Sequence, residues 1–260
     1  MNRQQLDAFL RKVTPREQYY LDHPGARSPI YQTTKQEILH GRPAYVFQLP
    51  DLPQDEIHVR KDSRFTDVPY YVHSNVNINY IYSGHCDYLI DDLPVTLYQG
   101  DVAIFDLDVV RRKKHLGEND IVINLNLTHA FFNDSFLRKA GEQNIFSEFM
   151  LRVLSTRSPT HDHYMIFRTQ DEPDIRNLFT SLLCEYFSDL PYRKPLIQGY
   201  FHLIFLYLLR LHQQHSDGQM VQIVSIHNRK VVDILYYIES HYASCTLKDL
   251  SDHFGYHPKY

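Results

Sequence analysis

Between residues 64 and 130, short runs of alternating side chains are closed by turn residues, and this pattern constrains the fold most strongly. Val76, Ile78 and Tyr80 alternate with asparagines, a period of two that is typical of a strand. Asp91-Asp92 is one of the turn signals between runs. The other expected strands are Cys86–Ile90, Val95–Tyr98, Val102–Phe105, Ile121–Leu127 and Tyr164–Phe167. Many short strands joined by turns predict a small antiparallel barrel.

Two helical stripes follow the expected barrel. Apolar side chains recur with helical spacing over Ile175–Phe187 and again over Ile197–Leu208. The short connection Leu190–Pro195 contains two prolines and predicts an antiparallel helical hairpin. At the other end of the chain, an amphipathic helix is expected around Asn2–Lys12, and the prolines after it indicate loops and edge segments.

The last 30 residues predict a helix, a tight turn and the start of another helix. Val231–Tyr242 carries an apolar helical stripe. Thr246 and Asp249 have the spacing of a capping box that begins a short helix. Gly255 suits the end of that helix, and Pro258 suits the first position of the next. This order is typical of a helix-turn-helix.

These residues resemble the AraC/XylS family of bacterial transcription regulators. The motifs that carry the resemblance are Tyr237–Tyr242, Thr246–Leu250 and Phe254–Tyr260, which are similar to the first half of the family's DNA-binding domain. Gly84–Asp101 more loosely resembles the family's cupin barrel, and the helical hairpin resembles its connector and dimerisation region. The resemblance covers roughly residues 65–260.

The resemblance implies an α+β chain in three parts. Residues 1–160 are expected to form a cupin-like antiparallel β-barrel with an N-terminal extension, and residues 161–218 an α-helical connector hairpin. Residues 226–260 are expected to form the first part of an all-α helix-turn-helix domain. The family's domain has two such units, whereas this chain stops two residues after Pro258. Because a recognition helix needs several turns to reach base edges, we expect this chain by itself to bind DNA weakly or not at all.

The resemblance also implies a set of DNA-contacting residues. Lys259 falls where the family places a base-contacting side chain, and His257 and Tyr260 flank it. Arg229 and Lys230, at the start of the preceding helix, are candidates for phosphate contacts. Acidic residues balance these cations in the same segment, so its electrostatic footprint is faint.

The candidate effector site is the row His73, Asn75, Asn77 and Asn79. If the likeness to the cupin barrel is in register, these side chains point inward, where buried amides need polar partners that a ligand supplies. In the alternative, Val76, Ile78 and Tyr80 face inward and the asparagines face solvent. Metal-binding cupins place two histidines and a glutamate here, and asparagine is a poor substitute, so no metal is expected.

Composition limits the remaining possibilities. Lys+Arg 27 against Asp+Glu 31 gives a net charge of −4, so DNA binding needs a local surface. The basic run Arg111–Lys114 is interpreted as a solvated loop or strand edge. Three scattered cysteines and a polar start suggest a cytoplasmic protein, and the apolar run Leu203–Leu209 is too short to span a membrane.

The sequence therefore predicts a transcription regulator, not an enzyme, with no catalytic residue and no cofactor. Its partners are DNA, through the complete protein, a small-molecule effector and a second copy of the chain. The hairpin at 171–215 is expected to dimerise through an exposed stripe, the alternative being that it packs on its own barrel. Two other functions stay open, a cupin-fold metal enzyme and a truncated product that dimerises without binding DNA.

Overall fold

The computed structural model describes residues 1–48, 57–107, 109–127, 163–214, 221–225, 237–238, 241 and 245–254. For residues 163, 221–225 and 252–254 only the backbone is described. The helix expected over Val231–Tyr242 and the start of the recognition helix at Pro258 lie outside these ranges, except for a few isolated positions. In the part of the chain that the structure describes, no helix has the length and apolar character needed to cross a membrane.

The N-terminal segment forms two capped helices and a short 3₁₀ turn, α1 (Arg3–Arg11), α2 (Pro15–Asp22) and η1 (Pro29–Gln32). The expected helix at Asn2–Lys12 is confirmed, and Asn2 caps it. The second helix differs from the expectation of loops in this proline-containing segment. Pro15 instead occupies the first turn of α2, where its missing N–H costs nothing, and Thr14 caps that helix in a reciprocal box with Glu17.

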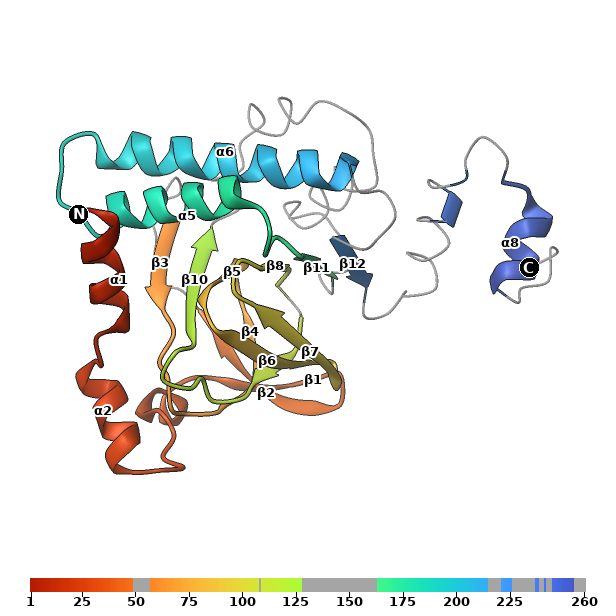
Figure 1. The fold of residues 1–260 in the computed structure, drawn as a ribbon. Coiled ribbons are helices and arrows are strands. Elements are labelled where there is room, and N and C mark those ends of the chain that lie inside the picture. The colour runs from red at the N-terminus through yellow and green to blue at the C-terminus, as the bar shows by residue number, and fades with distance from the viewer. Residues whose placement is uncertain are drawn as a thin grey trace.

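The strands form two six-stranded sheets (Figure 1). The first has the order β1-β2-β4-β9-β6-β7, and the second has the order β12-β11-β8-β5-β10-β3. The bounds are β1 (Gln36–Leu39), β2 (Arg42–Phe47), β3 (Ile57–Lys61), β4 (Val68–His73), β5 (Val76–Ser83), β6 (His85–Ile90), β7 (Leu93–Tyr98), β8 (Val102–Phe105), β9 (Arg111–Lys113), β10 (Ile121–Leu127), β11 (His163–Phe167) and β12 (Val221–Ser225). Among the described pairs, only β2 and β4 are parallel.

A shared core joins the two sheets. Ile81, Tyr88, Leu97 and Phe105 belong to one buried cluster although β6 and β7 lie in the first sheet and β5 and β8 in the second. The predicted turn at Asp91-Asp92 is confirmed, since both residues have positive φ values, 46° and 66°, as a tight hairpin turn requires. The antiparallel, barrel-like β unit of an α+β fold is thus present as predicted.

The helical hairpin covers the outer face of the second sheet (Figure 1). It consists of α5 (Pro173–Tyr186) and α6 (Arg193–Gln214), so both predicted helices are confirmed. Their apolar stripes are buried against Val76, Ile78 and Tyr80 of β5 and neighbouring strands. The stripe that the sequence suggested for a partner therefore packs on the chain's own barrel, which is the alternative noted above.

Two further predictions near the end of the chain are confirmed. The strand expected at Tyr164–Phe167 is β11, which pairs with β8. The short helix after Thr246 is α8 (Leu247–Phe254). The Thr246 hydroxyl accepts a hydrogen bond from the Asp249 backbone N–H at 3.2 Å, and the Asp249 carboxylate accepts one from the Thr246 backbone N–H at 2.8 Å. This is the predicted capping box.

Candidate effector pocket

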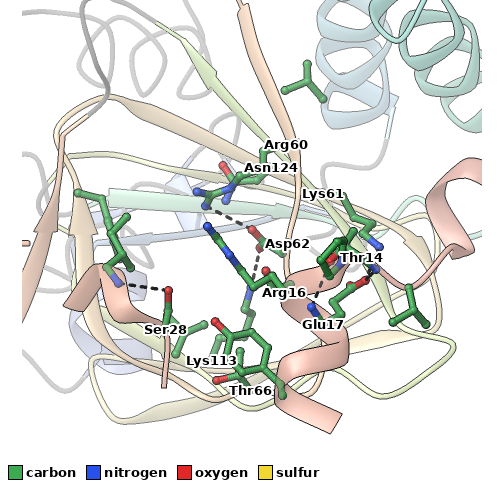
Figure 2. A pocket seen from close by; sticks show the side chains of 18 of the residues that line it. Thr14, Arg16, Glu17, Ser28, Arg60, Lys61, Asp62, Thr66, Lys113 and Asn124 are labelled. Carbon is green, nitrogen blue, oxygen red and sulfur yellow. Dashed lines mark hydrogen bonds and ion pairs between the residues drawn. The ribbon is translucent and has the colours of Figure 1, made fainter. Parts of the chain in front are cut away.

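A pocket of about 790 Å³ lies between the N-terminal helices and the barrel (Figure 2). The end of α1, the start of α2 and η1 supply one wall. Strands β3, β4, β9 and β10 supply the other, with Phe47 from β2 and Phe187 from the end of α5. The volume is within the range of small-molecule sites, and the N-terminal helices form part of its enclosure.

A buried carboxylate, Asp62, lies on the barrel side of the pocket. The Lys113 Nζ atom is 2.6 Å from one of its oxygens, and the Arg60 Nη2 atom is 3.5 Å from the other (Figure 2). Burial by itself raises the pKa of Asp62, but the charges of Lys113 and Arg60 outweigh it and hold that pKa below its usual range. Burial likewise lowers the pKa of Lys113, and Asp62 more than compensates, so both groups stay charged.

A second carboxylate, Glu17, fastens α2 to the barrel. Its side chain is fully buried and accepts hydrogen bonds from Arg64 Nε at 2.9 Å and from Lys61 Nζ at 3.0 Å. Arg64 in turn donates to the carbonyl oxygens of Arg11, Lys12 and Glu118. One ion pair therefore ties the end of α1, the start of α2 and the loop before β10 together beside the pocket.

Two buried polar atoms on the pocket wall have no hydrogen-bond partner among the described residues. They are the hydroxyl oxygen of Tyr20, a residue 2% exposed, and Nδ1 of His73, a residue 6% exposed. Burial, followed by the charge of Arg111, holds the pKa of His73 well below its usual range, so its imidazole is neutral. Because buried polar groups are normally paired, an unpartnered hydroxyl and ring nitrogen in one pocket indicate a place for a ligand or water.

The asparagines of β5 lie inside the barrel and bond to other side chains. The Asn77 amide nitrogen donates to Asn124 at 2.6 Å and to Asn126 at 2.9 Å. The Asn79 amide nitrogen donates to Asn77 at 3.0 Å, and the Tyr88 hydroxyl donates to Asn79 at 2.6 Å. The alternative in which the asparagines face solvent is wrong, because both faces of β5 are buried, one by the barrel and one by the hairpin.

The four predicted effector residues do not gather in one place. His73 lines the pocket. Asn77 and Asn79 are fully buried in the asparagine network and are not part of the pocket lining. Asn75 lies in the turn between β4 and β5, half-buried, and accepts a hydrogen bond from the Ser74 hydroxyl at 2.9 Å. Their role in binding an effector stays a prediction. The five predicted DNA-contacting residues all lie outside the described residues.

Sequence reasoning missed the buried cations of β9, of which Lys113 lines the pocket. The expectation of a solvated loop or strand edge at Arg111–Lys114 is wrong for two of its four members. Arg111 is 0% and Lys113 4% exposed, because they alternate inward along β9. Arg111 donates to Asn77 at 2.7 Å and packs over the Phe105 ring. The alternation of the run was the available signal, but a run of like charges is more often solvated. Within the described ranges, no group of three histidines, cysteines or carboxylates is placed to hold a metal ion.

No protein-family model matches the chain, and no curated protein matches it. The chain is similar to the solved structures of ToxT and CuxR. An apo structure of ToxT from Vibrio cholerae is 9% identical, with a TM-score of 0.40 over 77% of this chain and 70% of ToxT. The AraC-like transcriptional activator CuxR is 10% identical, with a TM-score of 0.36 over 72% of this chain and 58% of CuxR.

A cupin-2 domain protein from Shewanella frigidimarina is a smaller match. It is 10% identical, with a TM-score of 0.24 over 44% of this chain and 93% of that protein. These likenesses, at such low identities and TM-scores, concern the arrangement of the chain and carry no argument about what the pocket does.

Proposed function

We propose that the chain is the effector-sensing part, together with the first portion of the DNA-binding part, of a cytoplasmic AraC/XylS-type transcription regulator. The observation that carries the sensing half is the pocket beside the barrel, with its unpartnered Tyr20 hydroxyl and His73 nitrogen. The DNA-binding half is supported by the sequence motifs between Val231 and Tyr260. Nothing in the motifs or in the pocket assembles a nucleophile with a base, so the proposal includes no enzymatic step.

The pocket has a direct structural route to the helical hairpin through β10. Asn124 lines the pocket, while its neighbours Ile123 and Leu125 belong to the core that packs against α5 and α6. A ligand that contacts both β10 and α2 stabilises one position of α2 relative to β10 over another. A regulator needs this property, because an effector shifts an equilibrium only by its differential affinity for the two states.

We propose further that the chain dimerises through the outer face of α6. Leu196, Leu203 and Leu206 are 42%, 45% and 43% exposed, and their spacing of seven and three residues places them on one helical seam. This seam differs from the buried stripe that packs on the barrel. An exposed leucine seam on a 22-residue helix is a suitable surface for a second copy of the same helix.

Leu203→Glu tests the dimer. A charge in the middle of the seam is expected to convert a dimer to a monomer in sedimentation velocity, because the partner's leucines then face a carboxylate. Leu190→Glu is the matched control, since Leu190 is 55% exposed and lies in the connection between α5 and α6, off the seam. A wild-type chain that sediments as a monomer at high concentration contradicts the proposal.

The DNA half is tested with duplexes selected from a random library by the product of the gene that encodes this chain. Lys259→Ala is expected to cost about 1–3 kcal/mol on the selected duplex and less on a scrambled one, because a base contact carries specificity. Arg229→Ala is expected to weaken binding to both duplexes alike and to reduce the salt dependence by about one unit of slope, as loss of a phosphate contact does. Failure to enrich any sequence contradicts this half of the proposal.

A further inference from the structure

We propose that the pocket binds a small organic anion, a carboxylate or phosphate ester that carries an aromatic or other apolar body. This inference deepens the sensing half of the proposed function by assigning a ligand class to the same pocket. It is independent of the DNA-binding half, because it concerns only the residues between the N-terminal helices and the barrel.

The charge of the pocket is opposite to that of the chain. The chain has a net charge of −4, yet five basic side chains and two carboxylates line the pocket. Both carboxylates are already neutralised, Glu17 by Arg64 and Lys61 and Asp62 by Lys113. Among the described residues Arg16 makes no ion pair, and Arg60 reaches Asp62 through one nitrogen at 3.5 Å. The two guanidinium groups therefore retain the capacity to bind an anion.

The unpartnered polar atoms complement those cations. The Tyr20 hydroxyl oxygen and the His73 Nδ1 atom are buried in the pocket wall without a hydrogen-bond partner, and a rotation of the side chain is needed to turn either group toward an anion. Figure 2 shows Arg16 extending from α2 into the pocket and Arg60 on the opposite, barrel side. An anionic group between these two walls replaces water at several donors at once, which is the recurrent pattern of anion recognition.

The remaining lining is apolar and aromatic. The Phe47 ring lies 6.1 Å from Tyr31 and 5.7 Å from Tyr71 between ring centroids, so three aromatic residues form one cluster on the pocket wall. Such rings favour a flat apolar partner. An inorganic cation is disfavoured by the surrounding basic groups, and inorganic phosphate alone leaves the aromatic wall unused. An anion with an apolar body satisfies both features.

Two fluorescent probes that differ by one anionic group test the proposal directly. Anilinonaphthalene sulfonate carries a sulfonate on an aromatic body, and N-phenylnaphthylamine is its neutral counterpart. Titration into the full chain at neutral pH is expected to show the sulfonate bound at least about tenfold more tightly, the scale of a hydrogen bond to a charged group. Equal affinity for the two probes overturns the proposal, as does the absence of sulfonate binding to a chain whose circular dichroism is that of the folded protein.

Variants place the binding in this pocket. Arg16→Gln and Arg60→Gln are each expected to weaken the sulfonate by about tenfold and to leave the neutral probe unchanged. Arg27→Gln is the matched control, because Arg27 is exposed, lies on the same N-terminal segment and does not line the pocket. Tyr20→Phe is expected to weaken the sulfonate without moving the urea midpoint, since that hydroxyl has no partner to lose.

The outcomes distinguish failure of the anion pocket from failure of DNA binding. If Arg16→Gln and Arg60→Gln behave like Arg27→Gln, the sulfonate binds elsewhere and the assignment of this pocket is wrong. Sulfonate binding that depends on both arginines, in a protein that enriches no DNA sequence, supports the pocket assignment and contradicts only the DNA-binding half. Sequence-specific DNA binding by a protein that prefers the neutral probe supports the DNA-binding half and contradicts the assignment of an anion to the pocket.

Discussion

Glu17→Gln tests how α2 is held against the barrel. The Glu17 carboxylate is fully buried and accepts hydrogen bonds from Arg64, from Lys61 and, at 2.8 Å, from the Thr14 backbone N–H. Glutamine keeps the shape of the side chain but removes the charge and presents an N–H₂ group to the Arg64 guanidinium. The substitution therefore leaves a buried arginine without its counter-ion, which is one of the more costly single changes in a protein.

The size of the effect follows from the pKa of Glu17. Burial by itself raises that pKa, but the hydrogen bonds from Arg64, Thr14 and Lys61 outweigh burial and lower it from 4.5 to about 2. At about 1.4 kcal/mol per unit, the ionised carboxylate contributes about 3 kcal/mol to the free energy of unfolding. Since the folded-state pKa is depressed, this contribution is complete above pH 4.5 and is lost as pH falls toward 2.

Urea unfolding followed by far-ultraviolet circular dichroism measures the loss, because the chain has no tryptophan for fluorescence. We expect Glu17→Gln to lower the free energy of unfolding by about 3 kcal/mol at neutral pH, and the deficit to shrink by more than half at about pH 3. Glu37→Gln is the matched control: Glu37 pairs with the exposed Lys35, and its loss is expected to cost less than about 1 kcal/mol. A deficit for Glu17→Gln that is equally small, or that does not change with pH, refutes the reasoning.

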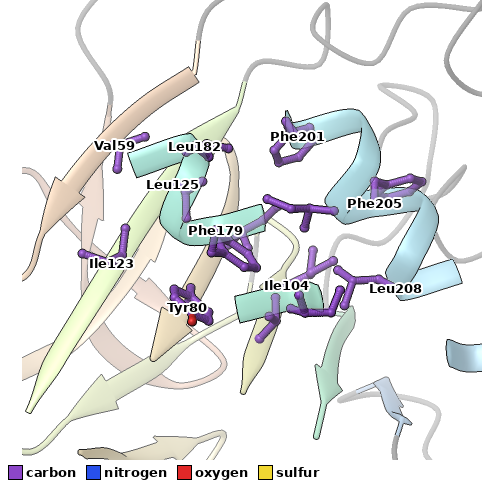
Figure 3. Packing of buried hydrophobic residues seen from close by; sticks show 14 of the residues in the cluster. Val59, Tyr80, Ile104, Ile123, Leu125, Phe179, Leu182, Phe201, Phe205 and Leu208 are labelled. Atoms are coloured by element: carbon purple, nitrogen blue, oxygen red, sulfur yellow. The ribbon is translucent and has the colours of Figure 1, made fainter. Parts of the chain in front are cut away.

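Two further substitutions test the packing on either side of the barrel. Phe179 of α5 stacks on Tyr80 of β5 with 4.0 Å between ring centroids (Figure 3), so Phe179→Ala is expected to cost about 3–5 kcal/mol in urea unfolding; a loss below about 1 kcal/mol contradicts the packing of hairpin on sheet. Gly84 has a φ of +70°, and a Cβ there collides with the Asp120 carboxylate. Gly84→Ala is therefore expected to lower the free energy of unfolding by more than Gly25→Ala does. Gly25 has a φ of +84° and no neighbour near its Cβ position, so that control reports backbone strain alone. Equal losses for the two variants show that the Asp120 side chain moves aside without cost.

Much of the fold is predictable because its signals are local. The turn at Asp91-Asp92, the capping box at Thr246 and the helical spacing in α5 each depend on residues a few positions apart. The burial of the two faces of β5 is not predictable in this way. Its asparagines and its apolar residues alternate, but both faces are buried, and only the position of a hairpin a hundred residues later in the chain explains why.

The candidate pocket is less predictable, because its residues come from distant segments. Glu17 meets Arg64 across 47 positions, and Lys113 meets Asp62 across 51, so neither pair has a sequence signature. Lys113 also illustrates why composition misleads: a cation in a basic run is usually solvated, and here a buried aspartate keeps it charged inside the barrel. Of the predicted effector residues, His73 reaches the pocket wall through its place at the end of β4.

The proposal that this chain belongs to a dimeric regulator that reads DNA is tested most directly by sequencing the duplexes recovered from a random library by the product of the gene that encodes it. We expect one enriched motif made of two half-sites, whose centres are separated by a whole number of helical turns, about 10 base pairs each. Recovery of duplexes without any shared motif, at a level no higher than with the protein omitted, contradicts it.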